Sequence, residues 1–279
     1  MKEKVAVVKC NSYEKTAVAE AAGKIFALCG IREDAFRKIL FKPNMLSART
    51  PEEGVTTHPA VVEAAARYFK NSEKIIGDSP ANINKPAELY WDKCGYKKVS
   101  EDSGAPLVKF SNSFMLDILP LFPSPRRGES QDEGDKGKNI DIPVTNYLKE
   151  FSLVNIAKLK THGLTILTAA VKNLYGLIPG FRKSVLHSIF VSPLHFSEFI
   201  AVYYYAVKDY VSFNIVDAIV SMEGSGPAAG KLRETGYLIG GANAIAVDIA
   251  CCKLIGIRPE NIPYLKIYGE RYGLPEIEL

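Results

Sequence analysis

The sequence predicts an α/β fold whose mostly parallel sheet is built from βαβ units. Short runs rich in β-branched residues recur along the chain, helical apolar periodicities lie between them, and turns rich in Gly, Pro and polar residues follow the runs. Strands that alternate with helices pair in parallel through crossovers. Because ligands bind such sheets beyond the carboxyl ends of the strands, we expect the ligand cleft there.

The N-terminal part of the chain repeats a strand-and-helix order. The expected elements are a strand at 5–10, a helix at 14–29, a strand at 38–44, a helix at 58–70, a strand at 74–80, a helix at 86–94 and a strand at 106–110. Each strand is short and apolar and ends in a polar or Gly-containing turn, as in KILFKPN and KIIGDSP.

The C-terminal part continues the alternation. Expected here are a strand at 151–160, helices at 164–175 and 193–207, strands at 213–220 and 235–241, and a helix at 242–256. The helix at 193–207 has Ser192 to cap it, Pro193 in its first turn and apolar residues at helical spacing. We interpret its apolar face as core or subunit contact rather than a groove for a lipid or cofactor.

One segment interrupts this order. Residues 124–138 (SPRRGESQDEGDKGK) mix both charge signs with Gly and Ser and have no large apolar side chain, so they cannot bury a core of their own. We expect a disordered inserted loop there. The 279-residue chain is long enough for a single α/β domain, with two lobes as the alternative.

Composition and charge narrow the classes of partner. The formal net charge of +4 is small for 279 residues, which favours anionic small molecules over nucleic acid. No apolar run reaches the length of a membrane span and no signal-peptide pattern opens the chain. The five cysteines are scattered without a CxxC pair, so the chain has no iron–sulfur motif of its own. We therefore expect a cytoplasmic protein with reduced thiols and no membrane or nucleic-acid partner.

The apolar run 155–176 (NIAKLKTHGLTILTAAVKNLYG) carries Lys158, Lys160, His162 and Lys172. Burying an unpaired ammonium is costly, so these groups either reach solvent or line a site. We predict that Lys160, His162 and Lys172 are catalytic, on a strand end and the helix after it, while Lys158 reaches solvent at the rim. Imidazole titrates near neutrality and burial lowers the pKa of a lysine, so such a pair suits proton transfer.

Polar residues also follow the other predicted strands, and the TTHP stretch at 56–59 is typical of a helix N-terminus, where unpaired N–H groups favour an anion. The predicted substrate-binding residues are Lys42, Asn44, Thr57, His58, Ser79, Asn173 and Gly226. The alternative at 56–59 is that the Thr only caps the helix and His58 is exposed. The stretch GSGPAAGK at 224–231 lacks the GxxxxGK[ST] spacing of a phosphate loop, and we expect a loop that faces the cleft.

A metal is a further candidate at these strand ends. Histidine with carboxylates can bind divalent zinc, iron or nickel, and Asp78, Asp217 and His187 are the candidate ligands. Sequence spacing alone leaves their convergence open. The cofactor therefore stays unknown, with a divalent metal as the candidate.

Several of these stretches together resemble the domain-of-unknown-function family 362. The matching stretches are KPN (42–44), TTHP (56–59), GDSP (77–80), AKLKTH (157–162), VKNLYGLIPG (171–180), VDAI (216–219), GSGP (224–227) and AVD (246–248). Members are often joined to ferredoxin-type iron–sulfur modules, so the resemblance implies a ferredoxin-like protein as a partner. Ala242–Asn243 stands where an Asp–Pro pair is usual, and no ligand role is assigned to that turn.

The chain is also faintly similar to the nickel-pincer lactate racemase family. In that family a catalytic His, a cofactor-bearing Lys and a ligand His follow one another, as His162, Lys172 and His187 do here. Ala169–Ala170 stands where that family has a glycine pair before the Lys. Residues 77–79 stand where that family has a turn with its other catalytic His. The likeness implies a shared fold and site location, and racemase activity is not inferred from it.

Two functions follow from these observations. The first is an enzyme that acts by acid/base chemistry on a small anionic metabolite, an organic acid or a phosphorylated compound, with or without a metal or cofactor. The second is a redox accessory protein that works with an iron–sulfur partner subunit.

Overall fold

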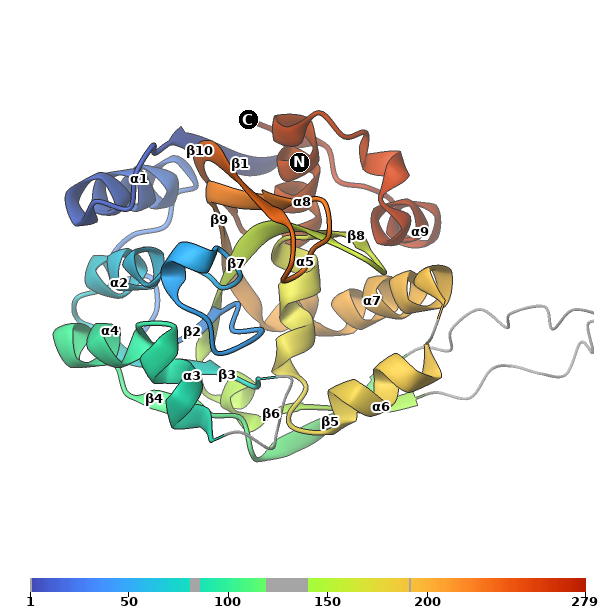
Figure 1. Cartoon of the computed structure of the whole chain (residues 1–279), viewed down its shortest axis with the longest axis horizontal. Helices are drawn as coiled ribbons and strands as arrows, with labels where there is room; N and C mark the ends of the chain where they lie inside the picture. Colours follow the sequence, from blue (N-terminus) through green and yellow to red (C-terminus); the bar gives the residue numbers. More distant parts are fainter. Residues whose placement is uncertain (1, 81–85, 119–139, 191) are drawn as a thin grey trace, which may run out of the picture.

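The computed structural model describes residues 2–80, 86–118, 140–190 and 192–279. Within these ranges a nine-stranded sheet crosses the molecule, with helices on both faces (Figure 1). Its order is β11 (Ile277–Glu278), β1 (Glu3–Lys9), β10 (Lys231–Gly241), β9 (Val211–Glu223), β7 (Ser152–His162), β2 (Lys38–Pro43), β3 (Glu73–Asp78) and β4 (Leu107–Lys109), with β8 (Ile166–Thr168) beside β7. The predicted α/β class with a mostly parallel sheet is confirmed.

The strands that run from β9 to β4 are parallel, so their carboxyl ends meet at one edge of the sheet. The pairing aligns Lys42 with Asn155, Asn155 with Asn214 and Lys158 with Asp217. Nearly all of β7 is buried, as expected for a central strand covered on both faces. On the other side of β9, β10 and β1 add antiparallel pairs.

Alternate residues of each strand face two separate apolar clusters. Ile39 and Phe41 pack in one cluster and Leu40 packs in the other, which is the two-residue period of a strand. The first cluster joins the sheet to α1 (Lys15–Leu28), α2 (Pro59–Tyr68), α3 (Ala87–Lys93) and α4 (Tyr96–Ser103). The second joins it to α5 (Ala170–Asn173), α6 (Arg182–Ile189), α7 (Pro193–Val207), α8 (Ala244–Ile255) and α9 (Pro263–Tyr272).

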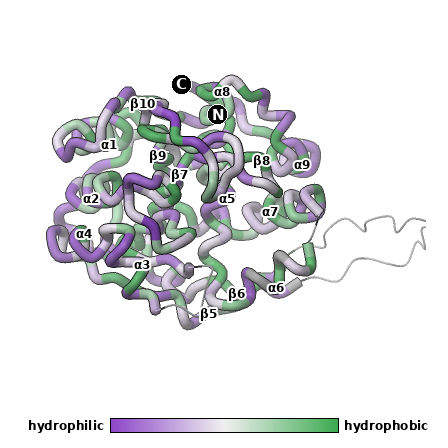
Figure 2. Tube along the Cα trace, in the orientation of Figure 1, coloured by the Kyte–Doolittle hydropathy of each residue, from purple (hydrophilic) through white to green (hydrophobic). Residues whose placement is uncertain are grey.

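The remaining elements lie around this frame. A separate two-stranded sheet pairs β5 (Ser113–Ile118) with β6 (Ile140–Thr145) and adds to the second apolar cluster. Short 3-10 helices are η1 (Pro51–Glu53), η2 (Asn146–Lys149), η3 (Leu174–Leu177), η4 (Lys208–Tyr210) and η5 (Pro259–Asn261). Figure 2 shows α8 largely hydrophobic and α4 largely hydrophilic, in keeping with nine buried residues in α8 and two in α4.

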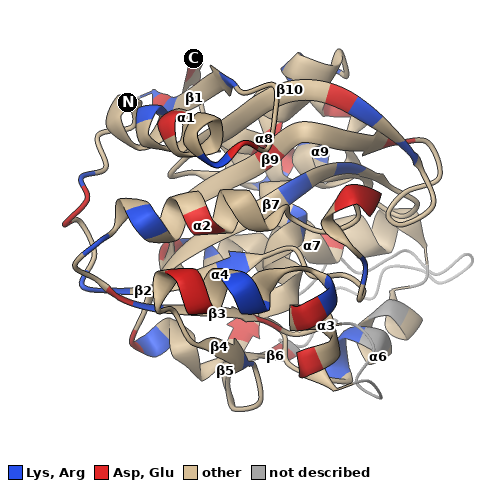
Figure 3. Cartoon of the chain, turned by 60° about the vertical axis from the view of Figure 1, so that its left-hand side comes forward, with Lys and Arg blue, Asp and Glu red and all other residues tan. Residues whose placement is uncertain are grey.

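Acidic and basic residues alternate over the outer surface of α2 and α4 (Figure 3). Glu63 of α2 contacts both Lys15, at 2.9 Å, and Arg67, at 2.8 Å, and Lys98 lies 3.3 Å from Asp102 on α4. Such partly exposed pairs contribute only a few tenths of a kcal/mol to about 1 kcal/mol each. This face is therefore largely a solvated surface, with Glu63 as its buried charge and exposed lysine and arginine partners around it.

The predicted helix at 164–175 is wrong in its first half. Gly163 and its neighbours turn the chain back, and β8 then pairs antiparallel with the end of β7, so that Thr168 lies opposite Lys160. Only at Ala170 does helix α5 begin. The apolar run after Gly163 is short enough to fit the residue spacing of either a helix or a strand. It forms a strand because it pairs with β7. The sequence interpretation did not predict the helices α4, α6 and α9 or the strands β5, β6 and β11.

The predicted loop at 124–138 lies outside the described residues, and the single-domain division stays a prediction. Among the helices that the structure describes, none is both long enough and apolar enough to cross a bilayer.

Candidate functional site

A small cavity of about 120 Å³ opens where β2, β3, β7 and α5 end or begin. We call it the lysine pocket. Its polar lining consists of Lys42, Asn44, Asp78, Ser79, His162, Lys172, Asn173 and Lys183. Seven of these eight residues were predicted site residues. The parallel register that aligns the strand ends explains why residues from distant segments meet here.

Lys42 and Asp78 form a buried ion pair at the floor of the pocket, with 3.1 Å between Nζ and Oδ1. Backbone N–H groups of Met45 and Ser79 also donate to the Asp78 carboxylate, at 3.0 and 2.7 Å. Burial lowers the pKa of Lys42, and Asp78 opposes that shift. Gly176 lies against the pair, and a Cβ there would come within 2.5 Å of the Lys42 ammonium. Only a glycine leaves room for this contact.

Lys183 enters the pocket from α6 and donates a short hydrogen bond to the backbone oxygen of Ser79. Its pKa is lowered to about 8, mainly by burial, with Asp78 raising it and Lys42 lowering it further. The Ser79 hydroxyl accepts the N–H of Gly180 at 3.0 Å, which ties the start of α6 to the end of β3. The sequence interpretation missed Lys183, because no sequence pattern near this residue predicts that α6 packs over the strand ends.

Lys172 is the lysine of the pocket that lacks an anionic or carbonyl partner among the described residues. Its Nζ lies over two aromatic rings, 4.6 Å from the centroid of Tyr175 and 5.2 Å from that of Phe196. Its pKa is lowered to about 7, first by burial and then by the charges of Lys183 and Lys42. At neutral pH a large share of this side chain is therefore an uncharged amine.

Helix α5, which carries Lys172, is anchored by Asp248 of α8. The buried carboxylate accepts the N–H groups of Ala170 at 2.7 Å and Val171 at 3.2 Å, and the hydroxyl of Tyr264 at 2.7 Å. Burial raises the pKa of Asp248 to about 7, and these three donated hydrogen bonds oppose the rise. Asp248 thus satisfies the first amides of a short helix and fixes its direction.

His162 stands at the end of β7, half-buried, on the wall of the pocket. Its Nδ1 accepts the N–H groups of Leu164 at 3.2 Å and Thr165 at 3.4 Å. In the neutral ring the proton therefore resides on Nε2, which is the nitrogen suited to exchange a proton with a ligand.

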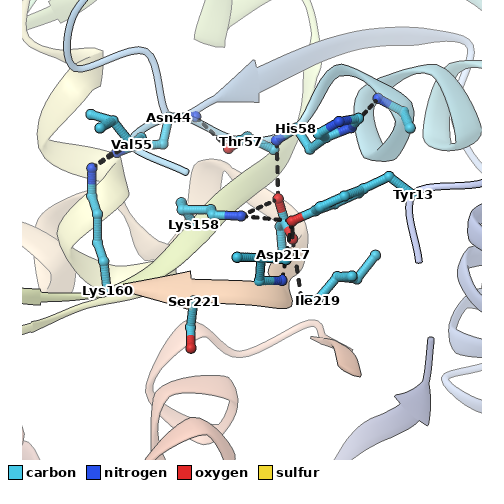
Figure 4. Close-up of polar contacts among 12 residues, drawn as sticks. Tyr13, Asn44, Val55, Thr57, His58, Lys158, Lys160, Asp217, Ile219 and Ser221 are labelled. Atoms are coloured by element: carbon cyan, nitrogen blue, oxygen red, sulfur yellow. Dashed lines mark hydrogen bonds and ion pairs between the residues drawn. The ribbon is translucent and has the colours of Figure 1, made fainter. Parts of the chain in front are cut away.

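Lys160 is absent from the described lining of the lysine pocket, and its contacts are shown in Figure 4. Its Nζ donates to the backbone oxygen of Val55 at 2.6 Å and to Oδ1 of Asn44 at 3.0 Å. Burial first, and then Lys172 and Lys158, lower its pKa to about 7. The predicted catalytic residue thus contacts the pocket through Asn44, which does line it.

A chain of buried asparagines continues from Asn44 beneath the pocket. Each amide nitrogen donates to the next amide oxygen: Asn44 to Asn173 at 2.9 Å, Asn173 to Asn155 at 2.8 Å, and Asn155 to Asn214 at 2.9 Å. Asn214 ends the chain by donating to the backbone oxygen of Ala242 at 2.9 Å. The network connects β2, α5, β7 and β9 and holds the amide of Asn173 in one orientation.

A second buried cluster lies nearby and consists of Tyr13, His58, Lys158 and Asp217; we call it the Asp217 cluster (Figure 4). Asp217 accepts from Lys158 at 2.9 Å, from the Tyr13 hydroxyl at 2.8 Å and from the His58 N–H at 3.0 Å. The prediction that Lys158 reaches solvent is wrong: it is 1 % exposed, because Asp217 faces it across the β7–β9 ladder. Burial lowers the pKa of Lys158, and Asp217 opposes that.

Two residues of the TTHP stretch have structural contacts instead of lining the lysine pocket. The Thr57 hydroxyl donates to the Ile156 backbone at 2.7 Å and accepts the Asn44 N–H at 2.9 Å. His58 caps α2 by accepting the Ala60 N–H at 3.2 Å, stacks on Tyr13 with centroids 3.7 Å apart, and lines a separate cavity of about 340 Å³. Burial lowers its pKa to about 4.

Residues 39–253, most of the chain, match the family described as Domain of unknown function (DUF362). The chain belongs to this family. It is also 26 % identical over 280 residues to a thylakoid-associated protein of Synechocystis sp., covering 98 % of this chain and 81 % of that relative.

Two solved structures share the fold of this DUF362 chain. A Thermotoga maritima protein superposes with a TM-score of 0.50 at 16 % identity, covering 90 % of this chain and 61 % of that one. The lactate racemase apoprotein from Thermoanaerobacterium thermosaccharolyticum superposes with a TM-score of 0.54 at 13 % identity, covering 89 % and 56 %. The DUF362 chain thus spans less than two thirds of either solved chain, and the likeness is one of fold.

The predicted metal ligands do not gather in this DUF362 chain as far as it is described. The described residues hold no group of three His, Cys, Asp or Glu side chains that could share an ion. Asp78 pairs with Lys42 and Asp217 with Lys158, and the side chain of His187 lies outside the described residues. A nickel cofactor needs several nitrogen or sulfur donors. Besides lysine amines and the thioether of Met45, the described lining offers a single imidazole, that of His162, and no thiolate. The described residues do not fit that group.

Gly226 is likewise absent from the described lining of the lysine pocket. A Cβ at this position would collide with the backbone oxygen of Thr161, so the glycine serves close packing of its loop. The Thr161 hydroxyl donates to the Gly224 oxygen at 3.0 Å, which holds that loop beside His162.

Proposed function

We propose that this protein is an enzyme that binds a small anion, an organic acid or a phosphorylated compound, and acts on it by acid/base chemistry. The observation that carries the proposal is the charge of the lysine pocket. Lys42, Lys172 and Lys183 face a cavity whose lining includes one carboxylate, that of Asp78. In a buried site the attraction between such an excess of positive charge and an anion is much stronger than in water.

Each lining residue has a role in this proposal that follows from its contacts. Lys42 and Lys183 hold the anionic group, because Asp78 and Ser79 fix their ammonium groups in place. His162 exchanges a proton with the ligand through Nε2. Lys172 supplies an amine whose pKa is lowered to about 7. Lys160 is a positioning residue that orients Asn44.

The cavity volume limits the substrate class. At about 120 Å³ it is smaller than the 300–1,000 Å³ that is typical of sites for drug-sized ligands. A compound of a few heavy atoms suits this space. A redox accessory role with an iron–sulfur partner and a cytoplasmic location both stay predictions, as does the binding of a metal.

Ligand-induced stabilisation tests the anion site. We expect inorganic phosphate or small carboxylates to raise the melting temperature of the wild type and to have little effect on Lys183→Met. A ligand at 100 times its Kd stabilises by about 2.7 kcal/mol, which a thermal-shift assay detects. The matched control is Lys38→Met, since Lys38 lies on β2 at the opposite end from Lys42 and is paired with Glu73 at 3.3 Å. Equal shifts for wild type and Lys183→Met would contradict the site.

Proton exchange tests the chemistry. Compounds that stabilise the wild type are incubated with it in D₂O, and loss of their C–H signals is followed by ¹H NMR. We expect His162→Asn to bind these compounds but to exchange their protons at least about 10²-fold more slowly, the usual contribution of a general base. Equal exchange rates for both proteins would remove His162 from the mechanism.

A further inference from the structure

We propose that Lys172 forms a Schiff base with the carbonyl carbon of a small oxo acid, an aldehyde or ketone that also carries a carboxylate or phosphate group. This inference rests on the proposed anion-binding function and names the substrate class of the same pocket. The geometry that points to it is the difference between Lys172 and the other buried lysines.

Four other buried lysines each donate to an oxygen in the described structure. Lys42 contacts Asp78, Lys158 contacts Asp217, Lys160 contacts Val55 and Asn44, and Lys183 contacts Ser79. No described oxygen accepts from Lys172, although it is nine-tenths buried and lines the cavity. A buried ammonium without an acceptor is unfavourable, so this site favours the neutral amine, which is the nucleophilic form.

The two flanking cations strengthen this preference and also select the substrate. Lys183 and Lys42 lower the pKa of Lys172 to about 7 in addition to the effect of burial. At pH 7 the neutral fraction is then roughly 10³-fold larger than for an ordinary lysine. The same two ammonium groups attract the anionic end of a ligand, which leaves its carbonyl end near the amine. A desolvated lysine beside a second cation is a known way to activate this nucleophile.

The lysine is also held for attack. Asp248 anchors the first amides of α5, and the rings of Tyr175 and Phe196 flank the ammonium. Both rings belong to the second apolar cluster, so the side chain has little freedom to swing away from the cavity. An amine that is fixed before the ligand arrives loses less entropy on reaction.

The reaction balances without any further reagent. The Lys172 nitrogen attacks the carbonyl carbon, the C–N bond forms, and one amine proton passes to the former carbonyl oxygen. The resulting carbinolamine loses this oxygen as water: the C–O bond breaks, the hydroxyl takes up a proton, and the nitrogen gives up its second proton. His162, on the same pocket wall, is the group placed to shuttle these protons.

Reductive trapping tests the inference. The wild type is incubated at pH 7 with glyoxylate and cyanoborohydride, and the modified lysine is located by peptide mass spectrometry. We expect one adduct at Lys172, formed at least about tenfold faster with glyoxylate than with the uncharged acetaldehyde, since one favourable charge contact contributes a factor of this order. Inorganic phosphate should slow it, and Lys38→Met should react like the wild type.

Two variants separate reactivity from folding and charge. Lys172→Met and Lys172→Arg should both lose the adduct, and the arginine keeps a cation in place. If neither variant folds, the wild type alone still tests the inference, since phosphate should slow the trapping of Lys172 by glyoxylate. Absence of an adduct at Lys172, or equal rates with glyoxylate and acetaldehyde, would overturn the Schiff base. If phosphate and carboxylates still stabilise the wild type in that case, the proposed anion site survives; if they do not, it fails as well.

Discussion

Lys158 and Lys172 are both buried toward the carboxyl-terminal edge of the parallel strands, yet their surroundings differ. Lys158 donates to the carboxylate of Asp217 and to the Tyr13 hydroxyl, at 2.9 and 2.8 Å, and every oxygen of that carboxylate has a donor. Lys172 has aromatic rings and two further cations around it. The first arrangement is complete without a ligand. In the second, no described oxygen accepts from Lys172.

The two clusters show that burial alone does not identify a catalytic lysine. A buried ion pair is strongly disturbed when one partner is removed, whereas a buried amine without a partner contributes little to stability. The Asp217 cluster therefore stabilises the fold at the β7–β9 junction, and the lysine pocket has the features of a binding site. The effects of substitution should differ accordingly.

The largest effect is expected from Asp217→Ala. This change leaves Lys158 buried without its carboxylate and removes the acceptor of Tyr13 and of the His58 N–H. We expect a loss of about 3–5 kcal/mol in the free energy of unfolding, measured by urea denaturation. Lys172→Met, by contrast, should lose none of this stability at pH 7, because it removes a buried amine whose protonation opposes folding. Similar losses in both variants would mean that the two lysines have equivalent structural roles.

A smaller effect is expected from Asp248→Asn, which changes the anchor of Lys172. An asparagine has one acceptor oxygen and turns a donor toward groups that are themselves donors, the amides of Ala170 and Val171 and the Tyr264 hydroxyl. We expect a loss of about 1–3 kcal/mol in urea denaturation. Trapping of Lys172 with glyoxylate should also slow and its pH profile should shift. Tyr264→Phe, which removes one donor only, is the matched control and should leave that profile in place.

The pH dependence of stability distinguishes the two clusters more finely. Lys172 has a folded pKa of about 7 against an ordinary value of 10.5, so between these values the unfolded chain binds more protons than the folded one. The free energy of unfolding therefore rises with pH over this window, by at most about 1.4 kcal/mol per pH unit for one such group. Lys160 and Lys183 add slopes of the same sign.

Removal of Lys172 should make that slope shallower. Urea denaturation of the wild type and of Lys172→Met at pH 7, 8 and 9 measures the difference, and the gap between the two proteins should close as the pH rises. Parallel curves across these three pH values would show that the folded pKa of Lys172 is near its ordinary value. Neutral amine chemistry at pH 7 would then be ruled out.

Much of the lysine pocket could be predicted from sequence because parallel strands share one functional edge. Lys42, Asp78 and His162 each follow or end a predicted strand, so topology alone brought them together. Lys172 stood out because it is a cation in an apolar helical stretch.

Other residues depended on tertiary contacts that carry no local signal. Lys183 reaches the pocket only because α6 packs over the strand ends, and Asp248 lies far along the chain from the helix that it anchors. Asn155 and Asn214 did leave a trace, since an asparagine inside a strand that is buried on both faces needs partners. The pairing of Lys158 could not be foreseen, because it required the register of β7 against β9.

The smallest effect is expected at His58, which the TTHP stretch suggested as a ligand residue. His58→Asn keeps a side chain that caps helices well but loses the stack on Tyr13. We therefore expect the free energy of unfolding to fall by about 1 kcal/mol or less. Because His58 lines a separate cavity, phosphate should still stabilise this variant as it does the wild type. Thermal-shift titrations of both proteins with phosphate measure this directly. A variant that folds normally but no longer responds to phosphate would place His58 in the anion site and merge the two clusters into one functional unit.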